Sequence, residues 1–520
     1  MKNINFIDKY GTFRIKNPEN YSGLYLPLAG EMGLKSSITP TLGGDSKTSQ
    51  NTFLLEPVSI ENLHNNKGTR NFWCRIVGKG FWSVCGSSAQ QEADRFTGNQ
   101  DESELEAGLM WQKLHRASKI YGLEADTTSF VTLDGSMEVM LVEITNKTEE
   151  DMEIVPIGAI PIYGRSADNI RDHRHVTSLL HRIETTQYGI EVTPVLSFDE
   201  RGHQKNDISY FVYGSSGNGE SPESFYPTVE QFIGEGGSFL NPEAVRTDKK
   251  GCCAGERFQG KEAVGAIKFA NRVIKPRETV SYIMLSGLTE KENDIEAITG
   301  RYQSAFEVKE ELNIVKRHWI DKVNIDFETG NTDEDNYLKW ICFQPILRRI
   351  FSHMAVMYAN ALYKQGFIKE GYKVLKTLLD TAMDFDRSRM YPGVPEYFDN
   401  DGRGLYSYLT GAASWYMLTM ITSVYGVHGE LGDLVIEPAL MPQQYNEKGD
   451  AKVSLEFAGH GFDITIHNSD RIAPEYAQIK RALCDGVKVE TVTENSVRIP
   501  KHAIEILSTD KCHTVEIYIE

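Results

Sequence analysis

The sequence predicts a multidomain β + α protein in which β-rich segments lie on both sides of one helical block. Three observations favour this fold class. Before residue 295, short segments of alternating apolar and polar residues, such as Met137–Thr145, are separated by clusters of Asn, Asp, Gly and Ser, which is typical of antiparallel strands. Apolar residues at helical spacing begin after Asp294. Alternating segments return after Gly432.

We therefore expect four consecutive parts. Residues 1–295 are predicted to form an N-terminal antiparallel β-sandwich. Linker helices are expected over 296–325, a helical domain over 326–431 and a C-terminal β-domain over 432–520. The helical part spans about a hundred residues, which is enough for roughly four or five helices of ordinary length.

Individual elements follow from local signals. We expect a helix from Asp333 to Ile350, kinked at Pro345, because acidic residues stand at its start and proline lacks the amide hydrogen. A helical hairpin is expected over 354–379, broken near Gly366, and another helix over 411–424. The predicted C-terminal strands are Val453–Phe457, Asp463–Ile466, Val487–Val492, Ala503–Leu507 and Thr514–Ile519.

Composition narrows the class of protein. The 520 residues carry 73 acidic and 55 basic side chains, for a net charge of -18, which disfavours binding to nucleic acid or to anionic membranes. The seven cysteines are scattered without C-x-x-C spacing, so we expect reduced thiols rather than a zinc or redox site. The first residues lack the apolar segment of a signal peptide, and no apolar run is long enough to cross a bilayer. A cytoplasmic protein is the expectation.

The segment from Tyr391 to Trp415 combines aromatic, glycine, acidic and arginine residues, which suits a site for a sugar and an anion. Tyrosine rings offer an apolar face and a polar tip that match the C–H faces and hydroxyls of a pyranose. Thr410 and Gly411 stand at the start of a predicted helix, where free amides and the helix dipole favour phosphate. The alternative is an ordinary turn-rich loop capped by Thr410. The tyrosines of this segment are Tyr391, Tyr397, Tyr406 and Tyr408.

Several segments resemble one known family. They are Phe351-Ser352-His353-Met354, GFIKEGYKVL from Gly366, YPGVPEYF from Tyr391, GRGLYSYLTGAASW from Gly402 and GELGDLVIEP from Gly429. Together they resemble the inverting glycoside phosphorylases of glycoside hydrolase family 94, the cellobiose phosphorylase family, and particularly the phosphorylases of 1,2-β-linked oligoglucans. The resemblance extends over essentially the whole chain. The LTGAASW element followed by the GDLVIEP strand is specific, whereas the sandwich is not.

The resemblance implies an N-terminal β-sandwich, linker helices, an (α/α)6 barrel and a C-terminal β jelly-roll. The implied reaction is the reversible phosphorolysis of a β-glucoside to α-glucose 1-phosphate with inversion. One aspartic acid protonates the glycosidic oxygen while phosphate attacks the anomeric carbon from the opposite face. The resemblance implies no cofactor, because inorganic phosphate takes part as a co-substrate. It also implies a homodimer.

Three residues match the family's phosphate-binding positions. His353 lies in the F-x-H element, and Thr410 with Gly411 forms the T-G pair. A histidine donates to phosphate oxygens and a helix N-terminus adds backbone donors, which agrees with this role. The alternative for His353 is a histidine that packs on a buried helix face.

The chain departs from the family in its helical part. The stretch that carries the general-acid aspartate and a phosphate-binding arginine has no counterpart, so we infer an internal deletion near Ile350–Phe351, and expect a truncated (α/α)6-type domain. Arg348 and Arg349 are candidate replacement anion ligands, or else a solvated helix end. Glu396 is the candidate acid because Pro395 and Tyr397 flank it, although a sugar-hydroxyl contact is the favoured role for this carboxylate.

Sugar contacts are expected from the same segment. The predicted substrate-binding residues are Tyr391, Glu396, Tyr397, Arg403 and Tyr406. Arg403 stands between two glycines, which permit close backbone approach, and its alternative role is a salt bridge to Asp399 or Asp401. Trp73, Trp82 and Trp111 are expected to pack inside the sandwich rather than to form a sugar platform.

Three functions are consistent with these residues. The first is a phosphorylase of β-glucan oligosaccharides, impaired by the missing acid. The second is a non-catalytic carbohydrate-binding or assembly protein. The third is a hydrolase that uses water and a loop acid such as Glu396. The paired phosphate residues favour the first function, and the missing general acid favours the second.

Overall fold

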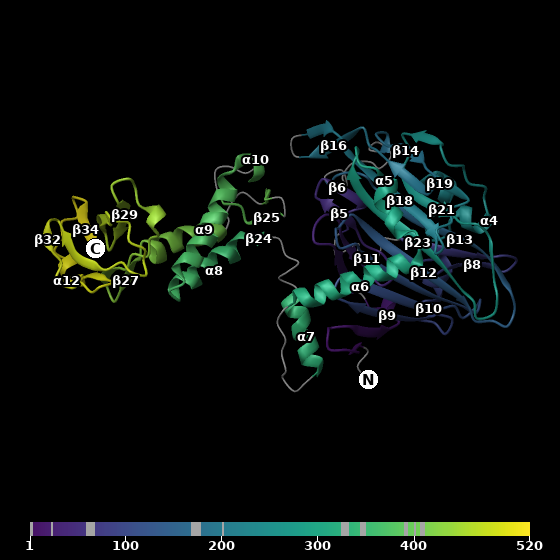
Figure 1. The fold of residues 1–520 in the computed structure, drawn as a ribbon, viewed down its shortest axis with the longest axis horizontal. Coiled ribbons are helices and arrows are strands. Elements are labelled where there is room, and N and C mark those ends of the chain that lie inside the picture. The colour runs from purple at the N-terminus through teal and green to yellow at the C-terminus, as the bar shows by residue number, and fades with distance from the viewer. Residues whose placement is uncertain are drawn as a thin grey trace. The chain divides into compact units, whose positions relative to one another are not determined.

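The computed structural model describes residues 4–21, 24–58, 68–167, 178–199, 202–323, 332–343, 350–388, 394–399, 402–405 and 411–520. The chain forms two compact units, Met1–Ile346 and Leu347–Glu520. Each of the two units drawn in Figure 1 has its own hydrophobic core.

A large antiparallel sheet forms one layer of the first unit. Among the described residues it has eleven strands, and neighbouring strands lie antiparallel throughout, for example with Met140 opposite Met284. The strands in spatial order are β1 (Ile4–Phe6), β2 (Phe13–Lys16), β9 (Glu102–Gly108), β10 (Trp111–Ala117), β11 (Leu123–Val131), β12 (Met137–Asn146), β23 (Thr279–Glu290), β18 (Ile208–Ser216), β15 (Gly189–Val192), β14 (Arg182–Thr185) and β20 (Arg257–Gln259).

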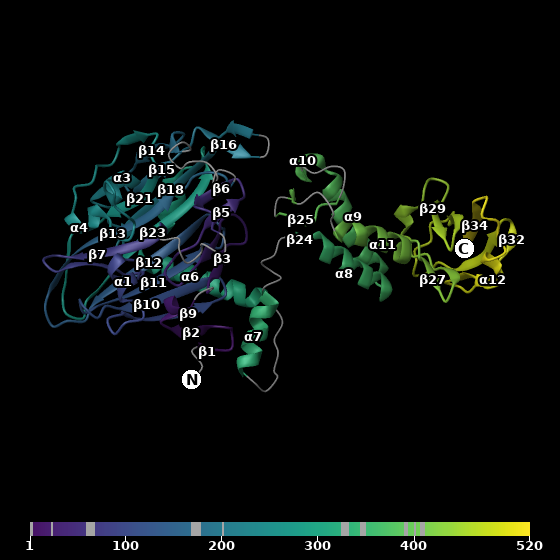
Figure 2. The ribbon, with the colours of Figure 1, turned by 180° about the vertical axis from the view of Figure 1, so that it is seen from behind.

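A second antiparallel sheet faces the first, as the two views in Figures 1 and 2 show. Its described strands are β19 (Ser224–Thr228), β21 (Ala263–Lys268), β13 (Met152–Ile162), β7 (Asn71–Ile76) and β8 (Gly80–Ser83), and β22 (Arg272–Ile274) pairs with β13. Smaller antiparallel groups are β3 (Leu26–Ala29), β4 (Lys35–Ile38), β5 (Ser46–Ser49) and β6 (Thr52–Leu55), and the pair β16 (Leu196–Asp199) and β17 (Gly202–Lys205).

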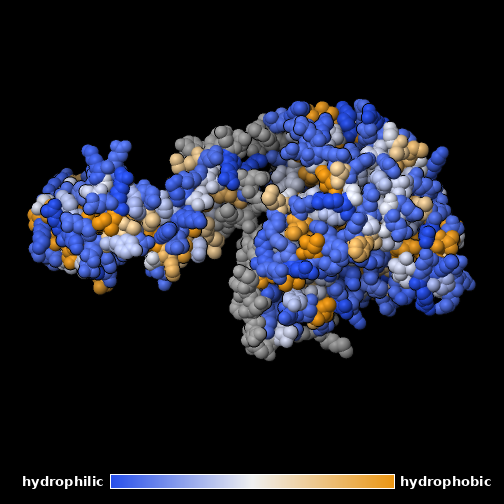
Figure 3. Space-filling view, in the orientation of Figure 1, coloured by the Kyte–Doolittle hydropathy of each residue, from blue (hydrophilic) through white to orange (hydrophobic). Residues whose placement is uncertain are grey.

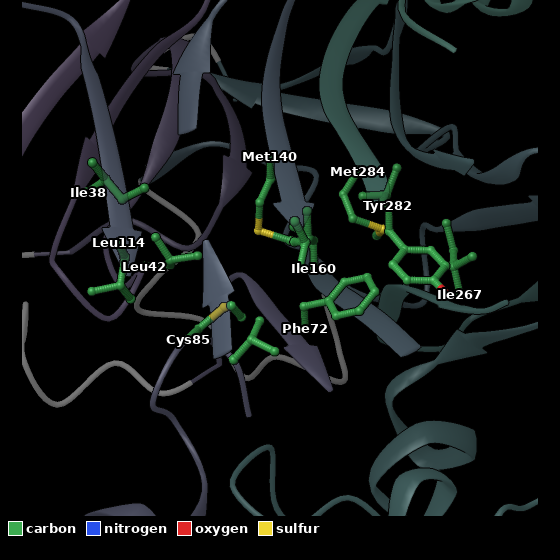
Figure 4. Close-up of a cluster of buried hydrophobic side chains, with 14 of the residues drawn as sticks. Ile38, Leu42, Phe72, Cys85, Leu114, Met140, Ile160, Ile267, Tyr282 and Met284 are labelled. Atoms are coloured by element: carbon green, nitrogen blue, oxygen red, sulfur yellow. The ribbon is translucent and has the colours of Figure 1, made fainter. Parts of the chain in front are cut away.

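The main core lies between the two large sheets (Figure 4). Alternate residues of each strand point into it because successive side chains of a strand face opposite sides. Met140 of β12 and Met284 of β23 come from one sheet, while Phe72 of β7 and Ile160 of β13 come from the other, and all four are buried. Burial of this apolar surface on both inner faces is what holds the sandwich together.

The outer face of the smaller sheet is also buried. Val155, Ile157 and Ala159 of β13 alternate with the residues that face the main core, and they form a second cluster with Trp73. Two short helices cover this cluster: α3 (Val229–Ile233) and α4 (Glu243–Thr247). The sheet is therefore apolar on both faces, which explains why the periodicity of β13 is weak in the sequence.

Helices link the sandwich to the end of the first unit. They are α1 (Ala89–Asp94), α5 (Ile295–Thr299), α6 (Ala305–Lys322) and α7 (Thr332–Phe343). Ser304 begins α6 with a capping box, in which its hydroxyl accepts from the amide of Glu307 and the Glu307 carboxylate accepts from the amide of Ser304. The visible face of this unit in Figure 3 is mostly hydrophilic, as expected for an acidic protein.

The second unit begins with helices. They are α8 (Ser352–Lys364), α9 (Ile368–Met383), α10 (Phe385–Ser388), α11 (Gly411–Thr419) and a π-helical turn over Met420–Val424. Gly366 ends α8 with a φ of 81°, a conformation that glycine adopts without strain. Helix α8 packs against both α9 and α11.

A small β-domain completes the second unit. One sheet contains β27 (Val427–Glu430), β28 (Asp433–Ile436) and β33 (Val497–Ile499). The other contains β29 (Asp450–Phe457), β30 (His460–His467), β34 (His513–Ile519), β31 (Ile479–Cys484) and β32 (Val487–Lys488), and α12 spans Lys501–Ile504. Apolar residues of α8 and α9 share one continuous core with this β-domain, so the helices and the sheets of the unit stabilise one another.

Most predicted elements are present. The helical hairpin broken at Gly366, the linker helix and the helix from Gly411 are confirmed. Trp73, Trp82 and Trp111 are at most 5% exposed, so they pack inside the sandwich, as predicted, and form no sugar platform. The described cysteines other than Cys342 are free thiols. The exact division into four parts stays a prediction.

Three predicted elements are wrong in extent or type. Ala503–Leu507 is not a strand, because Pro500 precedes a short helix that begins at Lys501. The strand predicted over 487–492 ends at Lys488. Ile350 is not helical, because its backbone pairs with Phe398 in a strand, and the helix that begins at Thr332 is described only to Phe343. Pro345, Arg348 and Arg349 lie outside the described residues.

Candidate functional site

Three short strands bring the start of α8 to the acidic loop. Strand β24 (Ile350–Phe351) pairs with β25 (Tyr397–Phe398), which pairs with β26 (Gly404–Leu405). The amide of Ser352 donates to the carbonyl oxygen of Glu396 at 2.9 Å. These backbone contacts place His353, in the first turn of α8, next to Glu396.

The imidazole of His353 packs directly on Gly411, the first residue of α11. A Cβ atom built on Gly411 would lie 2.6 Å from both Nδ1 and Cε1 of His353. Real Cβ atoms do not approach other atoms so closely, so the ring occupies space that only glycine leaves open. The ring of Trp415, one helical turn further along α11, has its centroid 6.3 Å from that of His353.

Glu396 contacts both of these helices. Its Oε1 lies 3.6 Å from Nδ1 of His353, and its Oε2 accepts a long hydrogen bond of 3.4 Å from the amide of Ala412. The side chains of His353 and Glu396 are 28% and 19% exposed, so a small solute can reach them. We call His353, Glu396, Gly411 and Ala412 the His353 site.

The amide of Ala412 is one of the backbone donors at the start of α11 that no carbonyl of the helix satisfies. Together with the dipole of the helix, this amide favours a negatively charged group. The imidazole supplies a side-chain donor on the same side. The site is therefore suited to hold an anion, and in this structure the facing negative group is the carboxylate of Glu396.

A polar contact joins α8, the helix that carries His353, to the end of α11 and the π-helical turn. The side-chain amide of Asn360 on α8 donates to Oγ1 of Thr419 at 3.3 Å and to Oγ of Ser423 at 3.0 Å. Asn360 is 4% exposed and Thr419 is fully buried, so these bonds lie inside the packed helices. Sequence reasoning missed Asn360. The available signal was that Asn360 is a polar residue on the otherwise apolar face of a predicted helix, which indicates a buried polar contact.

Arg403 lies in a tight turn near the site. The carboxylate of Asp399 accepts from the backbone amide of Arg403 at 2.8 Å, and the amide of Gly402 donates to the carbonyl oxygen of Asp399 at 3.0 Å. Gly402 has a φ of 83°, which fits its place in this turn. The Asp399 carboxylate thus holds the backbone of Arg403, and the salt bridge that was considered from sequence stays a prediction.

The structure brings together three of the predicted site residues, His353, Glu396 and Gly411, while Tyr397 lies one residue from Glu396 in β25. Tyr391, Asp401, Tyr406, Tyr408 and Thr410 lie outside the described residues. The roles of all these residues stay predictions. Among the described residues, no three His, Cys, Asp or Glu side chains gather closely enough to hold a metal ion. No described helix is long and apolar enough to cross a membrane.

Comparison with known proteins shows what the N-terminal sandwich is similar to. Residues 58–305 match the family model for the supersandwich domain of glycosyl hydrolase family 94. This range covers most of the two facing sheets, and it is just under half of the chain. The large sandwich is therefore similar to the supersandwich domain of this family. The comparison with curated proteins gave no match.

Solved structures give distant similarities. A bacterial glucoamylase in complex with acarbose is 7% identical with a TM-score of 0.39, and the match covers 76% of this chain and 56% of that one. A candidate kojibiose phosphorylase from the human microbiome is 7% identical with a TM-score of 0.28, over 65% of this chain and 38% of its own.

A family GH92 α-mannosidase from Bacteroides thetaiotaomicron is 10% identical with a TM-score of 0.31, over 97% and 94% of the two chains. The chain thus spans about half the length of the glucoamylase and little more than a third of the kojibiose phosphorylase. TM-scores of this size support no statement about function.

Proposed function

We propose that this protein is a glycoside phosphorylase of the family 94 type that acts on β-glucan oligosaccharides, with 1,2-β-linked glucans as the expected substrate class. The observation that carries the proposal is the contact between His353 and Gly411. Two residues that are 58 positions apart, and that match the phosphate-binding positions of the family, meet at one helix N-terminus. The supersandwich domain supports the same family independently.

The proposed reaction transfers a glucosyl group to phosphate. A phosphate oxygen held by His353 and the amides of α11 attacks the anomeric carbon of a β-glucoside. The new carbon–oxygen bond forms on the face opposite the glycosidic oxygen while the glycosidic bond breaks, so the product is α-glucose 1-phosphate. The leaving oxygen gains the proton that hydrogen phosphate loses when it becomes the sugar ester. Inorganic phosphate is the co-substrate and the proposal includes no cofactor.

The glycosidic oxygen must gain a proton as it leaves. Loss of a general acid lowers the rate about 10²–10⁴-fold. The side chain of Glu396 accepts a long hydrogen bond from the amide of Ala412 and faces the imidazole of His353, so its observed contacts are those of an acceptor. These contacts favour its role as a sugar-hydroxyl acceptor over the role of acid.

The alternative function is non-catalytic binding of carbohydrate and phosphate. It is favoured by the absence of the family's general-acid segment from the sequence. We also propose a homodimer in the cytoplasm with no nucleic-acid or membrane partner. These proposals rest on the family resemblance and on the acidic composition.

One assay separates these functions. The protein is incubated with a 1,2-β-linked oligoglucan with and without inorganic phosphate, and glucose 1-phosphate and free sugar are measured. Phosphate-dependent formation of glucose 1-phosphate is the expected result. Free sugar without phosphate would instead indicate a hydrolase, and sugar binding without either product would indicate the non-catalytic protein.

A substitution tests the phosphate site directly. Thr410→Val is expected to weaken phosphate binding about tenfold, since a hydrogen bond to a charged group contributes about 1.5–3 kcal/mol, with little change in sugar binding. The matched control is Thr422→Val. Thr422 lies on the π-helical turn, and its hydroxyl donates to the backbone carbonyl oxygen of Leu418. Equal phosphate affinity of the Thr410 variant and the wild type in calorimetry would contradict the assignment.

A further inference from the structure

The carboxylate of Glu396 lies where an anion is expected to bind. Its Oε2 is 3.4 Å from the amide of Ala412, and its Oε1 is 3.6 Å from Nδ1 of His353. These are the same two kinds of donor, a helix N-terminal amide and the imidazole, that are proposed to hold phosphate. A carboxylate and a phosphate oxygen compete for such donors because both are anionic acceptors.

Both contacts of Glu396 are long. A charge-assisted hydrogen bond between a nitrogen and a carboxylate oxygen normally measures 2.7–2.9 Å. At 3.4 and 3.6 Å the carboxylate faces both donors without a tight bond to either. A better-fitting anion with more oxygens can therefore displace it at small cost.

The backbone of Glu396 is held more firmly than its side chain. Its carbonyl oxygen accepts from the amide of Ser352 at 2.9 Å, and the adjacent Tyr397 pairs with Phe351 in the three-stranded sheet. The side chain can thus swing away from α11 while its backbone stays fixed. The site needs no rearrangement of helices to exchange one anion for the other.

We propose that Glu396 is an internal competitor for the anion position of the His353 site and sets its affinity for phosphate. This inference rests on the proposed phosphate-binding function of the same site. With the carboxylate on the amide of Ala412, phosphate binds only to the fraction of molecules in which Glu396 has moved aside. The apparent affinity is reduced by that fraction. Repulsion between the carboxylate and a nearby phosphate acts in the same direction.

A different role for Glu396 makes the opposite prediction. If its carboxylate only stabilises the N-terminus of α11, its removal lowers thermal stability and leaves phosphate affinity unchanged or weaker. If Glu396 competes with phosphate, its neutralisation raises phosphate affinity. The sign of the change therefore distinguishes the two roles.

The test is calorimetric titration of the full chain with inorganic phosphate at pH 7.5. Glu396→Gln keeps the shape of the side chain and removes its charge, and it is expected to bind phosphate about tenfold more tightly than the wild type. Glu370→Gln is the control, because this exposed residue of α9 carries the same charge on the same unit. It is expected to bind phosphate as the wild type does.

The outcomes separate this inference from the function on which it rests. Wild-type protein that binds phosphate, together with a Glu396→Gln variant of equal or lower affinity, would overturn the competition and leave the phosphate site standing. Folded protein of both kinds that binds no phosphate would overturn the site and the competition together. Circular dichroism checks that the variant is folded, and Glu396→Ala serves as the second variant if the glutamine form does not fold.

Discussion

Gly411→Ala is the substitution whose effect follows most directly from the structure. The added methyl carbon would lie 2.6 Å from two atoms of the His353 ring, whereas ordinary contacts begin at 3.4 Å. The ring must therefore move by about 0.8 Å or leave its rotamer. Overpacking of this kind costs about 1–3 kcal/mol, while alanine in a helix contributes about 0.5–1 kcal/mol relative to glycine. We expect a net destabilisation of about 1 kcal/mol.

The same contact predicts a dependence on His353. In a His353→Ala background the methyl group meets no ring, so Gly411→Ala is expected to stabilise the protein by about 0.5 kcal/mol. The coupling energy between the two substitutions is then about 1.5 kcal/mol, well above the error of a double-mutant cycle. The matched control is Gly300→Ala, since Gly300 has a helical φ of -58° and no atom within 4 Å of its added Cβ. Because Gly300 lies in the first unit, the stability of this control is followed through the tryptophans of that unit.

The assay is urea unfolding followed at the site itself. Trp415 is the only tryptophan after residue 346, so its signal in protein labelled with fluorotryptophan reports the second unit alone. A Trp415→Phe variant assigns that signal. If Gly411→Ala is as stable as the wild type and shows no coupling to His353, the ring does not lie on Gly411, and the proposed anion site loses its geometric basis.

Two further predictions concern stability. Asn360→Leu is expected to lower the free energy of unfolding by about 1–3 kcal/mol, because it removes the hydrogen bonds from Asn360 to Thr419 and Ser423 and places an apolar side chain against these two hydroxyls. Thermal melts check this, with the exposed Asn313→Leu as control, and an unchanged midpoint would contradict it. Burial lowers the pKa of His181 in the folded protein to about 3, whereas histidine in the unfolded chain has an ordinary pKa of about 6.5. Below pH 6.5 the unfolded state therefore binds a proton that the folded state does not bind. Because of His181, the free energy of unfolding is expected to fall by about 2 kcal/mol between pH 7.5 and pH 5, and His181→Leu should abolish this fall. An equal pH dependence of the wild type and the variant in urea unfolding would refute the prediction.

Local sequence patterns were sufficient to predict which segments form strands or helices and the order of these elements along the chain. The alternation of Met137–Thr145 predicts a strand, and the strand is present as Met137–Asn146, with Met140, Val142 and Ile144 in the core between the sheets. Gly366 marks the break of the helical hairpin, since its φ of 81° is unfavourable for other residues. The predictions failed where a pattern was short, as at residues 503–507, or where pairing with a distant strand decided the conformation, as at Ile350.

The residue types of the candidate site were also visible in the sequence, whereas their contacts were not. Histidine, glutamate and a glycine before an apolar helix indicate sugar and anion chemistry through their donors, acceptors and backbone freedom. Nothing in local spacing reveals that Glu396 faces the amide of Ala412, or that Asn360 joins α8 to the helix of Gly411. Such contacts join residues 16 or more positions apart, and they exist only because strand pairing and a shared apolar core bring the segments together.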